Sequence, residues 1–154
     1  MKKFLFLCGL ATALFALGCG GSGTGSGGGD EDVVDIYLSD YAAAYRTENL
    51  DALNELISSN YLNDCVTEED ILDEAAALFN DPLVSNIEIE YRNGLSTDVD
   101  LETGRATFTT TRRLTYDLNG VEQSDQTDFT NELRQEGLRW RLFGNQECNA
   151  AAKN

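Results

Sequence analysis

Apolar residues follow two different periods along this chain. Between residues 33 and 80 they recur every three to four positions, and after Pro82 they alternate with polar residues. The first period is typical of amphipathic helices, and the second of strands that bury one face. Helices followed by consecutive strands indicate an α+β domain in which three N-terminal helices pack on a curved antiparallel sheet.

The helical half contains recognisable start signals. Thr67 can cap a helix that follows it, and either Asn49 or Thr47 can cap the helix before that one, because these side chains accept hydrogen bonds from the unpaired amides of a first turn. The expected segments are helices at residues 32 or 33 to 46, at 50–58 and from 68 to about 79, with an irregular link at 60–65.

Turn residues divide the second half into strands. Asn119-Gly120 is a strong signal for a two-residue hairpin, and Glu136-Gly137 is expected to form the next hairpin turn. The expected strands are residues 87–101, 105–118, 121–135 and 138–146.

The two hairpin turns give a trial register. Around the first turn Arg112 lies opposite Thr127, and around the second Leu133 lies opposite Trp140. Because side chains alternate along a strand, this register gathers large apolar residues on one face, which we take as the concave face covered by the helices. Its members are Phe108, Leu114, Tyr116, Phe129, Leu133, Trp140 and Leu142.

Three motifs within these elements resemble those of a known superfamily. They are Tyr41-Ala-Ala-Ala-Tyr45, Glu48-Asn-Leu-Asp-Ala-Leu53 and the closing strand Leu138-Arg-Trp-Arg-Leu142. Over Val33 to Gln146 the chain is similar to the nuclear transport factor 2-like proteins, which include ketosteroid isomerase and polyketide cyclases. The resemblance implies a cone-shaped α+β fold.

The N-terminus has the parts of an export signal. Lys2 and Lys3 precede an apolar run of 14 residues, Phe4 to Leu17, which is too short to favour a retained membrane span. The order Phe15-Ala-Leu-Gly-Cys19-Gly20 resembles a bacterial lipobox and implies cleavage before Cys19 and acylation of its thiol, as with palmitate. The alternative is ordinary secretion by signal peptidase I, with Cys19 left as a disulfide partner.

The chain is therefore expected to have four parts. They are a signal peptide at 1–18, the lipidated Cys19 with a glycine-rich tether to residue 32, a domain at 33–148, and a disordered tail at 149–154. A coil of this length spans roughly 20 Å. The expected location is the bacterial cell envelope, and Gly20 after the cysteine favours the outer membrane, by resemblance to enterobacterial sorting rules.

The charge balance limits the partners. The formal net charge is −16, and it becomes −18 once Lys2 and Lys3 leave with the signal. Such a chain repels nucleic acid and anionic lipid headgroups, so membrane contact should come from the acyl chains. The chain has no histidine and no Cys-x-x-Cys pair, and we expect neither a metal site nor a cofactor.

Two cysteines remain once the signal and Cys19 are set aside. Cys65 and Cys148 are an even pair in an oxidising compartment, which favours a disulfide between positions 83 residues apart. Two unpaired thiols are the alternative.

Four polar residues on the expected concave face are the candidate ligand-binding groups: Arg112, Asp125, Thr127 and Asn131. The guanidinium of Arg112 could anchor an anionic ligand. Alternatively, Arg112 and Asp125 form a charge pair at the open, solvated end of the cone, and we give this interpretation the greater weight.

A catalytic interpretation would use Asp125 and Tyr116, which are residue types that ketosteroid isomerase employs. Their placement matches no family motif, and the histidine that cyclase and dehydratase members often use is absent. The sequence therefore favours a noncatalytic, membrane-tethered module that binds a small ligand or another protein. The alternative is a small-molecule enzyme of isomerase or cyclase type.

The opposite sheet face is a candidate homodimer interface, because this fold commonly dimerises there. The face is polar and flat, and its expected residues are Thr107, Thr109, Thr111, Arg113, Thr130 and Arg141.

Overall fold

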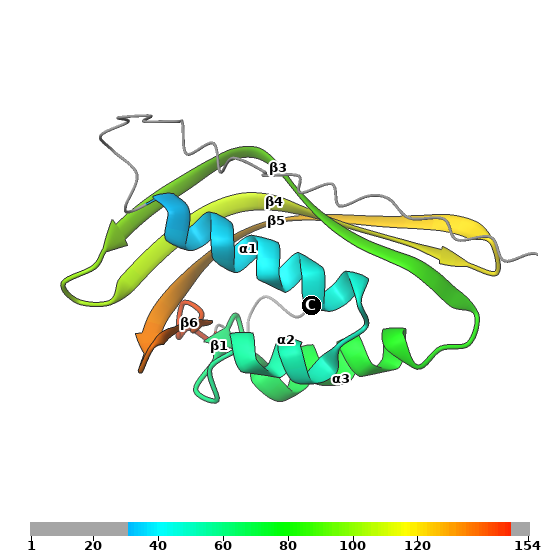
Figure 1. The fold of residues 1–154 in the computed structure, drawn as a ribbon, viewed down its shortest axis with the longest axis horizontal. Helices are drawn as coiled ribbons and strands as arrows, with labels where there is room; N and C mark the ends of the chain where they lie inside the picture. Colours follow the sequence, from blue (N-terminus) through cyan, green and yellow to red (C-terminus); the bar gives the residue numbers. More distant parts are fainter. Residues whose placement is uncertain (1–30, 149–154) are drawn as a thin grey trace, which may run out of the picture.

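The computed structural model describes residues 31–148, except for the side chains of Glu31, Asp32, Asn93 and Phe129. The expected signal segment, Cys19, most of the tether and the tail at 149–154 lie outside the described residues. Three α-helices pack on one face of a curved four-stranded antiparallel sheet, whose strand order is β3-β4-β5-β6 (Figure 1). The α+β prediction is confirmed.

The elements largely follow the expected order. They are α1 (Glu31–Arg46), α2 (Leu50–Leu56), β1 (Leu62–Asn63), β2 (Val66–Thr67), α3 (Glu68–Phe79), β3 (Val84–Asp100), β4 (Arg105–Leu118), β5 (Val121–Glu136) and β6 (Arg139–Leu142).

The first helix packs through one apolar stripe. Val34, Tyr37, Leu38, Tyr41 and Ala44 are each 5% exposed or less. Their spacing places them on one side of the helix, which lies along the concave side of the sheet beneath β3 and β4 (Figure 1). The helix begins only one or two residues before the expected start.

The link between α1 and α2 resolves which residue caps α2. The side chain of Asn49 accepts a hydrogen bond from the amide of Ala52 at 3.0 Å, so Asn49 is the cap. The hydroxyl of Thr47 instead donates to the carbonyl of Ala43 at 2.8 Å, at the end of α1. α2 ends earlier than expected because Ile57 is extended and forms a parallel bridge with Leu142 of β6.

The expected irregular link contains a short hairpin, made of β1 and β2. Asp64 and Cys65 turn the chain with φ angles of 51° and 68°. The next helix starts as expected: the side chain of Thr67 accepts from the amide of Asp70 at 3.3 Å, and the carboxylate of Asp70 accepts from the amide of Thr67 at 2.8 Å. This reciprocal capping box fixes where α3 begins.

The register between β4 and β5 is the predicted one. Leu118 pairs with Val121 around the turn, and Arg112 pairs with Thr127 further along. Asn119 and Gly120 have φ angles of 55° and 77°, the two positive values that a type I′ turn requires.

The predicted register between β5 and β6 is wrong by two positions. Leu133 pairs with Leu142 rather than with Trp140, and Trp140 pairs with Gln135. The two-residue loop is Gly137-Leu138 rather than Glu136-Gly137, because glycine supplies the positive φ at the first loop position, here 67°. A shift of two positions keeps every side chain on its predicted face. The strand itself is shorter than expected.

The longest strand gives the sheet its curvature. β3 spans 17 residues and pairs with β4 in three stretches, separated by register shifts between Ser85 and Glu88 and between Arg92 and Ser96. Such irregularities bend a strand and increase its twist. Figure 1 shows β3 curving over the helical layer, with the helices on the concave side of the sheet.

The core lies between this concave face and the helices. Leu53, Ile57, Ala106, Phe108 and Leu133 are each at most 1% exposed. Within the predicted apolar face, Phe108, Leu133 and Leu142 are buried, and Leu114, Tyr116 and Trp140 are partly buried against the core. In the described part of the chain, no helix combines the length and apolar character needed to cross a membrane.

Candidate functional site

A cavity of about 460 Å³ lies between the helices and the concave sheet face. This volume falls within the range of small-molecule sites. α1, α3, the β1–β2 hairpin and each strand of the large sheet contribute to its lining. Its aromatic residues are Tyr37, Tyr41, Tyr45, Tyr61, Tyr91 and Phe108.

Three of these tyrosines form a ladder on α1. Tyr37, Tyr41 and Tyr45 are spaced four residues apart, so they lie on the same side of the helix. The ring centroids of Tyr37 and Tyr41 are 6.1 Å apart, and those of Tyr41 and Tyr45 are 5.3 Å apart. The hydroxyl of Tyr37 donates to the carbonyl of Leu56 at 3.2 Å. The ladder gives the cavity a wall of aromatic ring surface.

Arg112 adds a positive charge to this aromatic environment. It lies on β4, opposite Tyr91 of β3 and Thr127 of β5, and its side chain is half-buried. Among the described residues that line the cavity, Arg112 is the one basic side chain.

Burial controls the ionisation of the phenols around Arg112. Burial raises the pKa of Tyr41 well above its ordinary value and also raises the pKa values of Tyr45, Tyr61 and Tyr91. The charge of Arg112 lowers the pKa of all four but does not cancel the effect of burial. The four hydroxyls are therefore protonated at neutral pH and can donate hydrogen bonds.

Asn131 is the buried amide of the site. It lies on β5 opposite Phe108 and is 4% exposed. Its side-chain oxygen accepts a hydrogen bond from the amide of Glu132 at 3.2 Å. Burial raises the pKa of Tyr61, and hydrogen bonding with Asn131 lowers it in part. Asn131 thus connects the segment after α2 to the sheet.

Three of the lining residues are exposed acids, Asp64, Glu74 and Asp128. They come from the β1–β2 hairpin, α3 and β5. These acids are therefore solvated, and the carboxylate of Asp128 accepts a hydrogen bond from Thr111 on the outer sheet face. Asn131 and four of the five lining tyrosines are buried.

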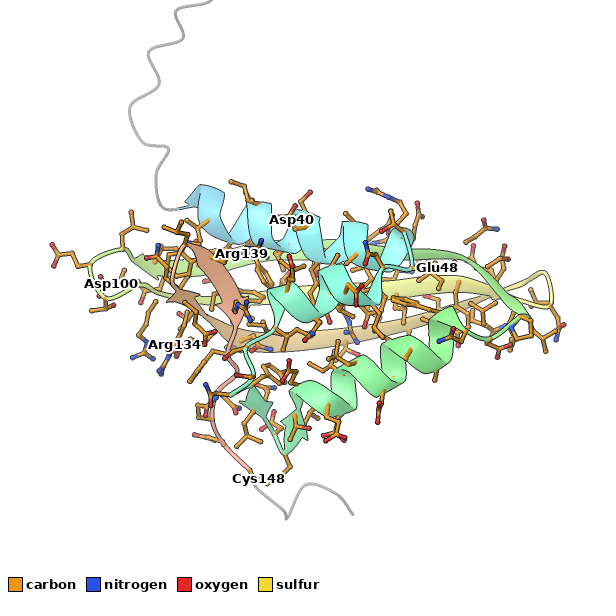
Figure 2. All side chains as sticks on the ribbon, turned by 60° about the horizontal axis from the view of Figure 1, so that its bottom comes forward. Asp40, Glu48, Asp100, Arg134, Arg139 and Cys148 are labelled. Atoms are coloured by element: carbon orange, nitrogen blue, oxygen red, sulfur yellow. A yellow bond between two sulfur atoms is a disulfide. The ribbon has the colours of Figure 1, made fainter. Side chains whose placement is uncertain are left out.

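A disulfide holds the β1–β2 side of the cavity in place. Cys65 is bonded to Cys148, as predicted (Figure 2 labels Cys148). The amide of Cys65 also donates to the carbonyl of Glu147 at 3.2 Å, and the amide of Leu62 donates to the carbonyl of Phe143 at 3.2 Å. These contacts fasten the hairpin, which supplies Asn63, Asp64 and Val66 to the lining, to the segment that follows β6.

Comparison with known proteins identifies the fold. No family model matches the sequence, and neither does any curated protein. A solved protein from Kribbella flavida is similar with a TM-score of 0.61 and 16% identity, over 75% of this chain and 86% of that one. A nuclear transport factor 2-like protein from Cytophaga hutchinsonii is similar with a TM-score of 0.56 and 9% identity, over 74% of this chain and 93% of that one. The chain has the nuclear transport factor 2-like fold.

A further neighbour carries a suggested activity. It is a candidate dehydratase of the nuclear transport factor 2-like family from Streptomyces avermitilis, with a TM-score of 0.55 and 14% identity, over 73% of this chain and 90% of that one. At such identity the likeness concerns the fold alone. What this nuclear transport factor 2-like cone does depends on the residues of its own cavity.

The structure brings three of the four predicted ligand-binding residues to the cavity. Arg112, Thr127 and Asn131 line it, and Asp125 is not among the lining residues. Asp125 lies opposite Leu114, further toward the β4–β5 turn, with an exposed side chain. Its carboxylate accepts a hydrogen bond from Thr127 at 3.4 Å.

The two predicted catalytic candidates do not meet in this cavity. Tyr116 is half-buried against the core and, like Asp125, is absent from the described lining. An acid and a phenol that act on one substrate must both reach it within hydrogen-bond distance. The described cavity does not offer that arrangement.

The residues that sequence reasoning missed are the tyrosines. None of Tyr41, Tyr45, Tyr61 and Tyr91 is among the candidate site residues that the sequence pattern predicts. All four line the cavity. The available signal was the spacing of Tyr37, Tyr41 and Tyr45, which predicts a row of phenols on one helix face. The described residues contain no acid or cysteine group arranged to hold a metal ion.

A second depression of about 720 Å³ lies on the far side of α1. It is more open and is bounded by α1, α2 and the β5–β6 turn. Among the described residues that line it, Arg139 is the one basic side chain, and it pairs with Glu55, another lining residue. Figure 2 labels Arg139 near the start of α1. The smaller cavity is the better candidate site because several polar groups converge on aromatic surface there.

Proposed function

We propose that this protein is a lipid-anchored bacterial envelope protein whose nuclear transport factor 2-like cavity binds a small, largely apolar molecule without transforming it. The observation that carries the binding function is the partly open aromatic cavity, in which Arg112 and Asn131 supply the polar contacts. Thr127 contributes a hydroxyl at its edge. Isomerase or cyclase chemistry is the weaker alternative, because Asp125 and Tyr116 lie outside the lining.

A cavity-filling variant tests the binding function. Ala75 on α3 lines the cavity and is 1% exposed, whereas Ala77 on the same helix is exposed. Ala75→Phe places a ring in the cavity, and Ala77→Phe is the matched control. The probe is N-phenyl-1-naphthylamine, whose fluorescence rises in apolar surroundings.

We expect Ala75→Phe to weaken probe binding by at least about tenfold, a loss of roughly 1.4 kcal/mol. Ala77→Phe should leave it unchanged. Circular dichroism and a melting curve establish that each variant is folded, and Leu78→Trp, also in the lining, replaces Ala75→Phe if it is not. Absence of binding by the wild-type protein, or equal binding by all variants, would contradict the proposal.

The lipid anchor rests on the lipobox around Cys19 and the glycine-rich tether that follows it. Mass spectrometry of the mature N-terminus tests it. We expect an acylated Cys19 in the wild-type protein and no lipid on a Cys19→Ala control. A free thiol at Cys19, or a mature chain that starts elsewhere, would overturn this part of the proposal.

Self-association through the outer sheet face is a further part of the proposal. The hydroxyls of Thr109 and Thr130 are 2.8 Å apart on this face, and Arg113 donates to Ser124 at 2.9 Å. The face is therefore a regular polar surface rather than an apolar one. Sedimentation at high concentration is expected to show a dimer, and a monomer alone would remove this part.

A further inference from the structure

The cavity combines donor groups inside with acids outside. Arg112 carries its one basic charge among the described lining residues, and the acidic lining residues Asp64, Glu74 and Asp128 are exposed. The described lining thus keeps the acidic balance of the whole chain, and Arg112 is the one described group in it that carries a full positive charge.

The phenols complement the guanidinium. Tyr41, Tyr45 and Tyr61 are each 7% exposed or less, and the Arg112 charge reaches all of them. Tyr41 and Tyr45 interact through their side-chain hydroxyls. Two hydroxyls that share one hydrogen bond have a second hydrogen to donate, so this pair can supply a donor to a bound oxyanion. Hydrogen bonds from a guanidinium and from phenols to an ionised oxygen are the stronger, charge-assisted kind.

The ring ladder favours a flat partner. Tyr41 and Tyr45 are stacked with an interplanar angle of 29°, and Phe79 meets Tyr45 edge-on at 5.4 Å. Aromatic pairs in such offset or edge-on geometries are worth about 0.5–1.5 kcal/mol beyond the area that they bury. A planar ring body can extend this arrangement along α1, which a branched aliphatic body cannot do.

We infer that the cavity selects a planar aromatic acid, with the oxyanion held by Arg112 and the ring body placed against the tyrosine ladder of α1. This inference rests on the proposed binding function and names its ligand class. The net negative charge does not oppose it strongly, because solvated charges beyond about 8–10 Å are screened at physiological salt. The contact with Arg112 is made inside the cavity, where screening is weaker.

Two probes that differ by one anionic group provide the test. 8-Anilino-1-naphthalenesulfonate and N-phenyl-1-naphthylamine share the anilinonaphthalene body, and only the first carries an oxyanion. Fluorescence titrations compare both probes on the wild-type protein, Arg112→Met and Arg112→Gln. Arg113→Met is the matched control, because Arg113 is the next residue of β4 and pairs with Gln126 on the opposite face.

We expect the wild-type protein to bind the sulfonate at least about tenfold more tightly than the neutral probe. Arg112→Met should weaken sulfonate binding by roughly 10–100-fold, as expected for lost hydrogen bonds to a charged group. It should leave the affinity for the neutral probe within about threefold of the wild-type affinity, a difference under 1 kcal/mol. Arg113→Met should change neither affinity. Arg112→Gln keeps a polar side chain of similar length and serves if the methionine variant does not fold.

The outcomes separate this inference from the function on which it rests. Equal binding of both probes by the wild-type protein, or a loss of both in a folded Arg112 variant, would overturn the anion selectivity while cavity binding stands. Binding of neither probe, or binding that Ala75→Phe does not reduce, would instead overturn the proposed function.

Discussion

Glu132 of β5 shows how a single carboxylate can stabilise a protein that has an excess of acids. It is 8% exposed, and its carboxylate accepts hydrogen bonds from Arg134, at 2.6 Å, and from Arg105. Burial raises the pKa of Glu132, but the hydrogen bonds and charges of the two arginines outweigh burial and lower it overall. Arg134 in turn lies over the ring of Phe143, with 3.7 Å between its guanidinium carbon and the ring centroid. Figure 2 labels Arg134 near the end of the sheet.

The ionised form of Glu132 is therefore expected to favour the folded state. Because its folded pKa is lowered, this contribution is present above the unfolded-state pKa of about 4.5 and is lost as the pH falls through the folded value. Glu132→Gln should lower the free energy of unfolding by about 1 kcal/mol at pH 7, since both arginines are half-exposed and solvent weakens the pairs.

Urea unfolding of Glu132→Gln and the wild-type protein at pH 7 and at pH 3 measures this effect. The difference in unfolding free energy between the two proteins should be smaller at pH 3 than at pH 7. Glu88→Gln, at an exposed position of β3, is the control. Its free energy of unfolding should stay within about 0.5 kcal/mol of the wild-type value at both pH 7 and pH 3. A difference that does not depend on pH would contradict the role assigned to the charge.

At the level of elements, the segment after β6 approaches the β1–β2 hairpin closely at Gly144. Gly144 has a φ of +82°, and a Cβ atom there would lie 2.2 Å from the carbonyl oxygen of Leu62. Gly120, in the β4–β5 turn, has a similar φ of +77°, but its added Cβ would meet nothing within 4 Å. The two glycines therefore share a backbone requirement and differ in the space around them.

This difference predicts that a glycine-to-alanine substitution lowers the free energy of unfolding by different amounts at the two positions. Gly120→Ala should lower the free energy of unfolding by about 1–2 kcal/mol through its left-handed conformation alone. Gly144→Ala should cost about 1–3 kcal/mol more, because the backbone of Leu62 must move. Chemical denaturation of both variants measures the two costs. Equal losses would show that the hairpin moves away without resistance.

At the level of the whole molecule, the Cys65–Cys148 disulfide connects the hairpin beside the cavity to the end of the domain. The two cysteines are 83 residues apart in sequence. Cross-linking a loop of that length stabilises a fold by roughly 4–5 kcal/mol in the chain-entropy model, which is an upper estimate.

Removal of the disulfide should therefore lower the melting temperature. We expect the double variant Cys65→Ser, Cys148→Ser to melt at a clearly lower temperature than the oxidised wild-type protein. Its free energy of unfolding should fall by as much as about 4 kcal/mol. Dithiothreitol should lower the wild-type melting temperature toward that of the variant and leave the variant unchanged. Melting curves that do not respond to the reductant would contradict the assigned role.

Local chemistry made most of the fold predictable. The capping box at Thr67, the Asn119-Gly120 turn and the alternation along β4 each depend on residues close in sequence, and each lies where it was expected. The register of β6 was missed because Gly137 can occupy either position of a two-residue loop as far as the sequence shows. The contact of Ile57 with Leu142, which ends α2, joins segments far apart in the chain.

The sequence by itself determined the order of the three helices and the four long strands and the concave face, and it favoured the pairing of Cys65 with Cys148. Periodicity, turn chemistry and cysteine number are local or compositional properties. It also supplied the lipobox around Cys19, which stays a prediction. Only the tertiary structure decided which residues line the cavity. The bends of β3 and the packing of α1 gather Tyr41, Tyr61 and Arg112 and leave Asp125 outside, since sheet curvature and helix placement depend on contacts that no local pattern specifies.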